Sequence, residues 1–237
     1  DEYRRGDRTI AELTITQIKE QLPLAISRVM TEGSLYDPEL AALAIKQSAG
    51  DIVEAIFLLR AYRTTLPRFT DSLPLDTTKT ALKRRVSAVY KDIPGGQLLG
   101  PTFDYTHRLL NFALAAESDQ AESMDDLETE DREFANCPHV LDLLMNEGLV
   151  MKPDEKRQAP VKDITRDPVQ FPAGRAERLQ LLARGDEGFL LSLAYSTQRG
   201  FGRTHPFMGE MRFGDIEIWL HPEELDMDIP IGTIEIT

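Results

Sequence analysis

Residues 37–64, DPELAALAIKQSAGDIVEAIFLLRAYRT, decide the fold of the first half of the chain because they encode two helices in immediate succession. The Asp-Pro pair at the start of this stretch is a typical helix beginning, since proline is tolerated at the first helical position. Gly50 is expected to end the first helix. Asp51 and Glu54 form a capping-box pattern, which predicts a second helix at about 52–64.

Upstream of this stretch, residues 15–30 repeat apolar side chains at three- and four-residue spacing. That spacing predicts an amphipathic helix, which Pro23 is expected to kink or split. Downstream, Val86 and its neighbours fit either a helix or a strand. Helical spacing returns from Phe103 to about Ala116 and again in a short helix from Val140 to about Leu149.

In the last third of the chain, the spacing of apolar residues changes from a helical period to the two-residue period of strands. Two helical pieces, Leu179–Ala183 and Phe189–Tyr195, are separated by a turn in which Asp186 is a plausible cap. From residue 216 onward, isoleucines alternate with polar residues, which predicts strands, and Pro230 with Gly232 indicates an edge position or a bulge.

These patterns predict an α+β fold that is predominantly helical with a strand-rich C-terminal segment. We expect residues 1–116 to form a helical part with a Gly-rich loop, and residues 117–177 to form an acidic and Pro-rich variable linker with one short helix. Residues 178–237 are expected to form helices followed by antiparallel strands, packed on 1–116 as one domain.

Charge is distributed unevenly along the 237 residues. The chain has 27 Lys and Arg against 40 Asp and Glu, a formal net charge of −13. Residues 117–133 alone carry −8, which is typical of a solvated or disordered linker, and residues 210–237 carry −7. This balance argues against an extended nucleic-acid surface, but the near-neutral remainder permits a small polyphosphate ligand.

Composition excludes several classes of protein. The single Cys137 rules out an internal disulfide framework and a cysteine-based zinc site. No run approaches the roughly 18 apolar residues of a membrane span, and the first residues carry no signal-peptide segment, so a cytoplasmic location without membrane association is expected. The common hydrolase, zinc-protease and dinucleotide motifs are absent.

The stretch from Lys91 to Asn111 is the first candidate site. A loop containing Gly95 and Gly96 leads into a predicted helix, and loop amides at a helix start can hold phosphate oxygens. The polar stripe of that helix consists of Asp104, His107, Arg108 and Asn111, at i, i+3, i+4 and i+7. The alternative is a solvated helix face on which Asp104 and Arg108 form an ordinary ion pair, and a lone histidine there is more often structural.

The loop at 196–207 is the second candidate. It is rich in hydrogen-bond donors and contains two glycines, and Arg199 with Arg203 could clasp phosphates bidentately. His205 lies in the same loop, although His205 and Glu210 are too isolated to indicate a metal pair. An exposed connector explains the same residues equally well.

Four blocks of the sequence resemble the PhnI family, the I subunit of the bacterial carbon-phosphorus lyase system. The blocks are RVMTEGSLYDPELAALAIKQSAGD (28–51), VEAIFLLRAYRTTL (53–66), RRVSAVYKDIPGGQLLGPTFDYTHRLL (84–110) and RGDEGFLLSLAYSTQRGFGRTHPFMGE (184–210). Compared with the family, the chain is expected to be a fragment that lacks a short N-terminal piece and the C-terminal part. That missing part carries further histidines in the family, so the metal site stays unknown.

The resemblance implies a ribosyl transfer in which an alkylphosphonate displaces adenine from ATP, giving a ribose 1-phosphonate 5-triphosphate. It also implies purine nucleosidase activity for the subunit alone. Such a reaction needs a proton donor, a carboxylate near the sugar and cations for the triphosphate. On this basis Asp92, Asp104 and His107 are the catalytic candidates. The substrate-binding candidates are Lys91, Gly95, Gly96, Arg108, Arg199, Arg203 and His205.

The resemblance also implies partners and cofactors. Mg²⁺ is expected with ATP, since it binds mainly through substrate phosphates, and no organic cofactor is expected. The implied partners are ATP, an alkylphosphonate and the lyase subunits G, H, J and L, with no nucleic acid and no membrane. One alternative is a non-catalytic helical scaffold subunit of that complex, and a more remote one is an unrelated acidic protein-binding module.

Overall fold

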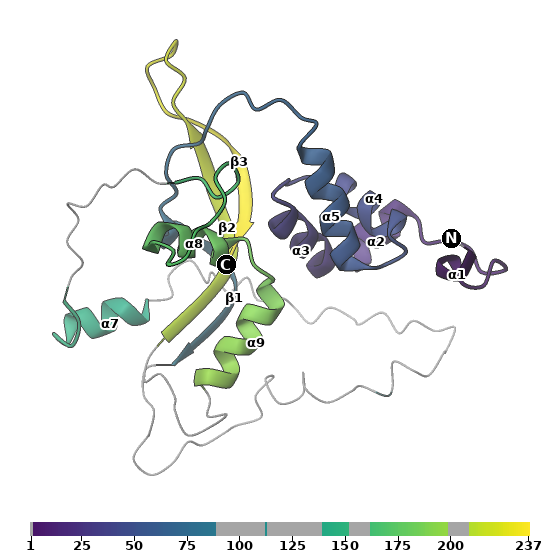
Figure 1. The fold of residues 1–237 in the computed structure, drawn as a ribbon. Helices are drawn as coiled ribbons and strands as arrows, with labels where there is room; N and C mark the ends of the chain where they lie inside the picture. Colours follow the sequence, from purple (N-terminus) through teal and green to yellow (C-terminus); the bar gives the residue numbers. More distant parts are fainter. Residues whose placement is uncertain (1, 89–111, 113–138, 152–161, 199–208) are drawn as a thin grey trace.

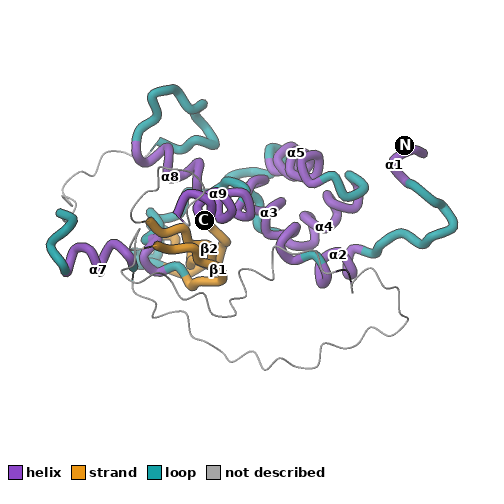
Figure 2. The backbone as a smooth tube through the Cα atoms, turned by 90° about the horizontal axis from the view of Figure 1, so that it is seen from below, coloured by secondary structure: helices purple, strands orange, loops and turns teal. Residues whose placement is uncertain are grey.

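The computed structural model describes residues 2–88, 112, 139–151, 162–198 and 209–237 (Figure 1). Two groups of elements dominate these residues. The N-terminal helices lie together on one side of a three-stranded sheet, and further helices lie around the strands (Figures 1 and 2). Within this described part, no helix is both long and apolar enough to cross a membrane.

The N-terminal group consists of five helices. They are α1 (Glu2–Arg5), α2 (Ile15–Gln21), α3 (Pro23–Gly33), α4 (Pro38–Gln47) and α5 (Ile52–Arg63). The split predicted at Pro23 is confirmed, because Leu22 is at once the C-cap of α2 and the N-cap of α3. Proline at the first position of α3 has no amide hydrogen to donate back into α2, so the chain turns there.

Local capping fixes the two helices of the opening stretch. The Asp37 carboxylate accepts hydrogen bonds from the amides of Glu39 and Leu40, and the Asp51 carboxylate does the same for the second and third residues of α5. Gly50 adopts φ 89° between them, a conformation that favours glycine. The two predicted helices and the boundary between them are therefore confirmed.

Helices α2 to α5 enclose the larger apolar core. Its fully buried members are Ile18, Ile26, Val29, Met30, Ala41, Ala42, Ala44, Ile45, Ala55, Ile56 and Leu59. Alanines on α4 and α5 allow the helix backbones to approach closely, and Gly33 at the end of α3 lies against Leu59. Close packing of this kind makes the group a well-defined layer.

The sheet contains β1 (Ala81–Ala88), β2 (Gly209–Leu220) and β3 (Ile229–Ile236) in the order β1-β2-β3. Both pairings are antiparallel. The β2–β3 register skips Ile231, and Gly232 there has φ 150°, so β3 carries a bulge at the edge of the described sheet. The edge or bulge predicted from Pro230 and Gly232 is confirmed on both counts.

Among the described residues, three helices and one 3₁₀ turn lie around the strands. They are η1 (Thr77–Lys79), α7 (Val140–Asn146), α8 (Arg175–Ala183) and α9 (Glu187–Gln198). Helix α9 contacts β1 and β2, while α7 contacts β2. The Asp186 carboxylate accepts the amide of Phe189 at 3.1 Å, so the predicted cap of this helix is confirmed.

The helical layer meets the sheet at β3. The Tyr36 hydroxyl donates to the carbonyl oxygen of Glu235 at 2.9 Å, and the Thr31 hydroxyl approaches the same oxygen at 3.5 Å. Arg28 of α3 forms an ion pair with Asp186 at 2.9 Å, which ties the layer to the turn before α9. Segments far apart in sequence are thus joined by hydrogen bonds and charge as well as by packing.

Two outcomes qualify the sequence predictions. Strands are not confined to the C-terminal segment, because the ambiguous stretch around Val86 forms β1 and pairs with β2 more than a hundred residues later. The helix predicted at Phe103–Ala116 and the acidic segment 117–133 lie outside the described residues, apart from Phe112.

Candidate functional site

All the site residues predicted from the sequence lie outside the described residues. Lys91, Asp92, Gly95, Gly96, Asp104, His107 and Arg108 fall in 89–111, and Arg199, Arg203 and His205 fall in 199–208. The structure does describe where both stretches join the fold. Strand β1 ends at Ala88, strand β2 begins at Gly209, and these two residues are direct partners in the antiparallel ladder. The two predicted segments therefore attach to the same end of one strand pair.

A polar cluster lies beside this end of the strand pair. We define it by its members, Arg85, His139, Glu210 and Arg212. In the register, Arg85 faces Arg212 and Ser87 faces Glu210, so Arg85, Glu210 and Arg212 point to one face of the sheet. His139 precedes α7 and reaches the cluster from the side.

Glu210 is the centre of the polar cluster. Its carboxylate accepts from Arg212 Nε at 2.7 Å and lies 3.0 Å from Arg85 Nε. The backbone amide of Val140 donates to it at 3.1 Å. Only 11% of the Glu210 side chain is exposed, so a cation on each side compensates for burying its charge.

His139 has a defined hydrogen-bonding role. Its Nε2 lies 2.9 Å from NH1 of Arg212, and a guanidinium can only donate, so Nε2 accepts. The neutral ring then carries its proton on Nδ1, which lies 3.7 Å from the Glu210 carboxylate.

A cavity of about 550 Å³ opens next to the polar cluster. Its walls come from η1, α7, α8 and the strands, and they are predominantly apolar. Lining residues include Val140, Leu144, Leu179, Leu182, Met211 and Ile236, with His139, Glu210 and Arg212 at the polar part. An apolar cavity with a few convergent polar groups suits a ligand that has a flat or apolar body and a polar edge.

The opposite face of β1 carries an ion pair whose acidic partner is buried. NH1 of Arg84 lies 2.7 and 2.6 Å from the two carboxylate oxygens of Glu187, the first residue of α9. Glu187 is only 3% exposed. Burial raises the pKa of the Glu187 carboxyl, and the Arg84 cation opposes this effect without cancelling it. The pair fixes α9 to the sheet.

Local sequence patterns did not predict that these groups would lie together. Arg84 and Arg85 were visible only as part of a basic run, and Glu187 and His139 carried no local signal. Their grouping depends on the β1–β2 register and on the position of α7, which are long-range features. In the described ranges, no group of three or more His, Cys, Asp or Glu is placed to hold a metal ion.

Comparison with known proteins gives consistent matches over nearly the whole chain. The family model described as "Bacterial phosphonate metabolism protein (PhnI)" matches residues 1–237. The chain is 57% identical over 234 residues to the alpha-D-ribose 1-methylphosphonate 5-triphosphate synthase subunit PhnI of Escherichia coli (strain K12), which covers 99% of the chain and 65% of that protein.

Two further relatives show the same pattern. The protein of the same name from Rhizobium meliloti (strain 1021) is 55% identical over 235 residues, with 99% of the chain and 62% of the relative covered. The putative C-P lyase subunit protein HtxH of Stutzerimonas stutzeri is 46% identical over 220 residues, with 89% and 58% covered. The chain thus spans less than two thirds of the length of these curated relatives.

Proposed function

The chain belongs to the PhnI family of bacterial phosphonate metabolism proteins, and from this premise we propose that it acts in phosphonate catabolism by ribosyl transfer from ATP. An alkylphosphonate oxygen attacks C1′ of the ribose, the bond from C1′ to adenine breaks, and the departing base takes up a proton. The products are a ribose 1-phosphonate 5-triphosphate and adenine. With water as the nucleophile, the same chemistry is that of a purine nucleosidase.

One observation carries this proposal. The pairing of Ala88 with Gly209 joins the ends of the two segments that hold the predicted site residues. A substrate with a triphosphate at one end and a base at the other needs groups from more than one segment, and these two segments leave the fold at adjacent points. Two of the relatives are named as ribose 1-methylphosphonate 5-triphosphate synthase subunits, which supports the choice of reaction.

The predicted residues match the needs of the reaction. Base departure builds positive charge on the sugar, which a carboxylate such as Asp92 or Asp104 can stabilise. His107 is suited to protonating the base, because imidazole titrates near neutral pH.

The remaining predicted residues are proposed to bind substrate. Lys91, Arg108, Arg199, Arg203 and His205, with the amides at Gly95 and Gly96, are proposed to hold the phosphates and the phosphonate. Mg²⁺ enters as part of the MgATP substrate.

The polar cluster is proposed to support this site. Glu210 and Arg212 hold His139 in one orientation at the edge of the apolar cavity, and the cavity suits the flat adenine ring. His139 is assigned a positioning role here, since both of its ring nitrogens already face protein groups.

The test is adenine release from ATP by the full-length protein, with and without methylphosphonate, followed by chromatography. His107→Ala and Asp104→Ala are each expected to lower the rate by about 10²-fold or more, the usual scale for acid–base groups. Arg175→Ala, an exposed residue at the start of α8, is the matched control. Unchanged rates in both variants, with circular dichroism like that of the parent, would remove these residues from the mechanism.

A second candidate function is a non-catalytic scaffold within a carbon-phosphorus lyase assembly. The relatives are named as subunits, and α5 presents Val53 and Phe57 to solvent at 70% and 68% exposure, one helical turn apart. An apolar pair of this kind is suited to docking another chain, for which subunits G, H, J and L are the proposed partners. A scaffold subunit alone releases no adenine from ATP, whereas the catalytic proposal requires adenine release by the full-length subunit on its own.

A further inference from the structure

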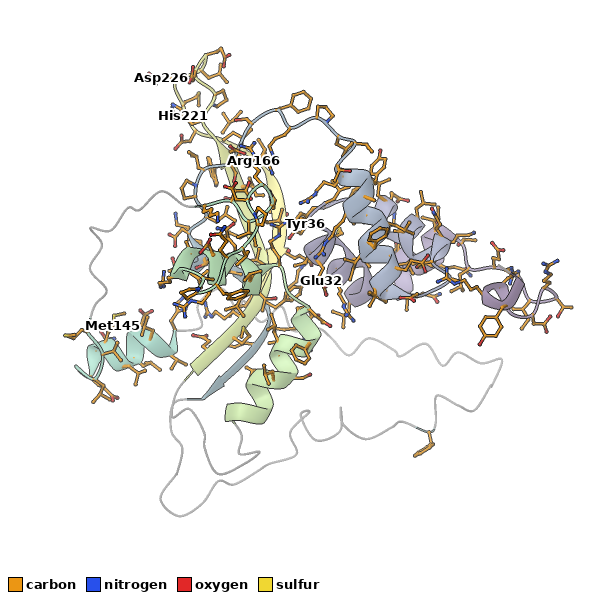
Figure 3. The ribbon with its side chains drawn as sticks, viewed as in Figure 1. Glu32, Tyr36, Met145, Arg166, His221 and Asp226 are labelled. Atoms are coloured by element: carbon orange, nitrogen blue, oxygen red, sulfur yellow. The ribbon has the colours of Figure 1, made fainter. Side chains whose placement is uncertain are left out.

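Three arginines lie near the junction between the helical layer and the turn that joins α8 to α9. Arg60 and Arg63 occupy the last turn of α5, at i and i+3 on one helix face, and Arg184 is the C-cap of α8. Figure 3 labels Glu32 and Tyr36 at this junction, between the helical layer and β3. We call Arg60, Arg63 and Arg184 the arginine triad.

Neutral acceptors orient two members of the triad. Arg60 Nε donates to the backbone carbonyl of Glu32 at 2.8 Å, and Arg184 Nε donates to the Ser34 hydroxyl at 2.7 Å. Both acceptors lie at the C-terminal end of α3, where Ser34 is the C-cap. These bonds fix the side chains but leave their positive charge uncompensated.

Arg63 has neither a hydrogen-bond nor an ion-pair partner among the described residues, although it is half-buried. Two other partly buried arginines of the described residues do have carboxylate partners: Arg28 pairs with Glu32 and Asp186, and Arg84 pairs with Glu187. The helix dipole favours positive side chains at the C-terminal end of α5. It does not explain why Arg63 is partly buried there without a counter-ion, because burying an unpaired charge costs free energy.

Asp163, the carboxylate whose charge acts on both Arg63 and Arg184, already has other partners. Asp163 lies 3.0 Å from NH1 of Arg68 and accepts hydrogen bonds from the Thr165 hydroxyl and amide. Burial opposes its ionisation, but these bonds outweigh burial and lower the pKa of Asp163 to about 2. Asp163 therefore pairs directly with Arg68, and its charge offsets only part of the positive charge of Arg63 and Arg184.

Mutual repulsion within the triad follows from this arrangement. Burial, and next the positive charge of Arg63, lower the pKa of Arg184. Burial, followed by the charges of Arg60 and Arg68, lowers the pKa of Arg63. Like charges held together in a partly buried place are stabilised when an anion enters among them.

We propose that the arginine triad binds a phosphoryl anion, either free phosphate or the phosphate chain of a larger ligand. Guanidinium groups match tetrahedral oxyanions because they offer paired, planar donors, and all of the donors of Arg63 are available among the described residues. The site is separate from the polar cluster and does not depend on the proposed ribosyl transfer. The triad is thus proposed as a polyanion-binding site in a protein whose net charge is negative.

Calorimetric titration of the whole chain with tripolyphosphate tests the site. Arg63→Gln is expected to weaken binding by about tenfold or more, the scale of one charge-assisted interaction. Arg175→Gln removes the same charge from an exposed position of α8 and is expected to change binding by less than about twofold. Because Arg63 makes no bond in the described structure, its substitution is not expected to disturb folding.

Thermal unfolding supplies a second measurement. Tripolyphosphate is expected to raise the unfolding temperature of the parent but not that of Arg63→Gln, and Arg60→Gln serves if Arg63→Gln fails to fold. Inorganic phosphate and ATP are then tested for their ability to displace tripolyphosphate, which distinguishes free phosphate from the phosphate chain of a larger ligand. Displacement by either compound supports the site. Absence of tripolyphosphate binding, or equal losses in Arg63→Gln and Arg175→Gln, overturns it.

Discussion

Glu187 shows how a single buried side chain links pH to stability. Its carboxyl lies at the start of α9, almost fully buried and paired with Arg84. Burial raises its pKa, so the folded chain holds the proton more tightly than the unfolded chain does. The stabilisation is complete below the ordinary carboxyl pKa of about 4.3 and is lost as the pH rises through the folded-state pKa.

Glu187→Gln removes this titration. The unfolding free energy of the variant relative to the parent is therefore expected to rise as the pH increases from about 4 to 7. Urea unfolding at several pH values measures the difference, and Glu223→Gln, on the exposed β2–β3 turn, corrects for the change in net charge. A difference that stays flat across this range, or falls, contradicts the raised pKa.

Tyr36 is a second residue whose interaction is expected to stabilise the fold measurably. Its hydroxyl donates to the Glu235 carbonyl across the junction between the helical layer and the sheet. Tyr36→Phe is expected to lower the unfolding free energy by about 1 kcal/mol, the net value of one hydrogen bond. Tyr62→Phe, whose ring is 46% exposed on α5, is the control and is expected to change it little. If chemical denaturation shows that both substitutions lower the unfolding free energy equally, the hydrogen bond from Tyr36 to Glu235 makes no net contribution to stability.

At the scale of elements, the β1–β2 pair depends on one glycine. A Cβ added to Gly214 would lie 1.9 Å from the backbone oxygen of Ala81, next to the irregularity between Leu82 and Arg84. The backbone of Ala81 cannot move aside as a flexible side chain can. A larger residue at Gly214 must therefore push β1 away from β2. Gly214 is thus required for the close approach of β1 to β2.

Gly214→Ala is accordingly expected to destabilise the protein by several kcal/mol or to detach β1, on the scale of the more severe overpacking changes. Hydrogen exchange of β1 amides and thermal unfolding report the two possibilities. Gly188→Ala, within α9, has only ordinary van der Waals contact at 3.4 Å and is expected to be neutral or mildly stabilising. Protection of β1 equal to that of the parent in Gly214→Ala would contradict the prediction.

The elements also show what the sequence can and cannot predict. The helices from Ile15 to Arg63 were predictable because their caps and their periodicity are local. Strand β1 was ambiguous because the run around Arg84 and Val86 lacks a clear two-residue period. Its conformation is set by pairing with β2, and the grouping of Arg85, Glu210 and Arg212 follows from that register alone. The predicted catalytic residues lie outside the described structure and stay predictions.

At the scale of the whole molecule, the described residues bury apolar side chains in two places, the helical layer and the sheet. The helical core is built from α2 to α5, while Phe213, Ile216, Leu191 and Ile236 are buried at the sheet. The proposed reaction site adjoins the β1–β2 end of the sheet, and the arginine triad lies at the junction of the two layers. The two proposed sites therefore use different parts of the fold and can be tested separately.

The bulged edge strand β3 has a consequence for how the protein behaves at high concentration. Pro230 offers no amide hydrogen, the bulge at Ile231 interrupts the repeat, and the Glu235 carbonyl accepts a hydrogen bond from Tyr36. A neighbouring copy that approaches this side meets no continuous row of vacant donors and acceptors. The third strand is thereby protected against templating fibril growth, the hazard that an exposed sheet margin carries in a crowded cell.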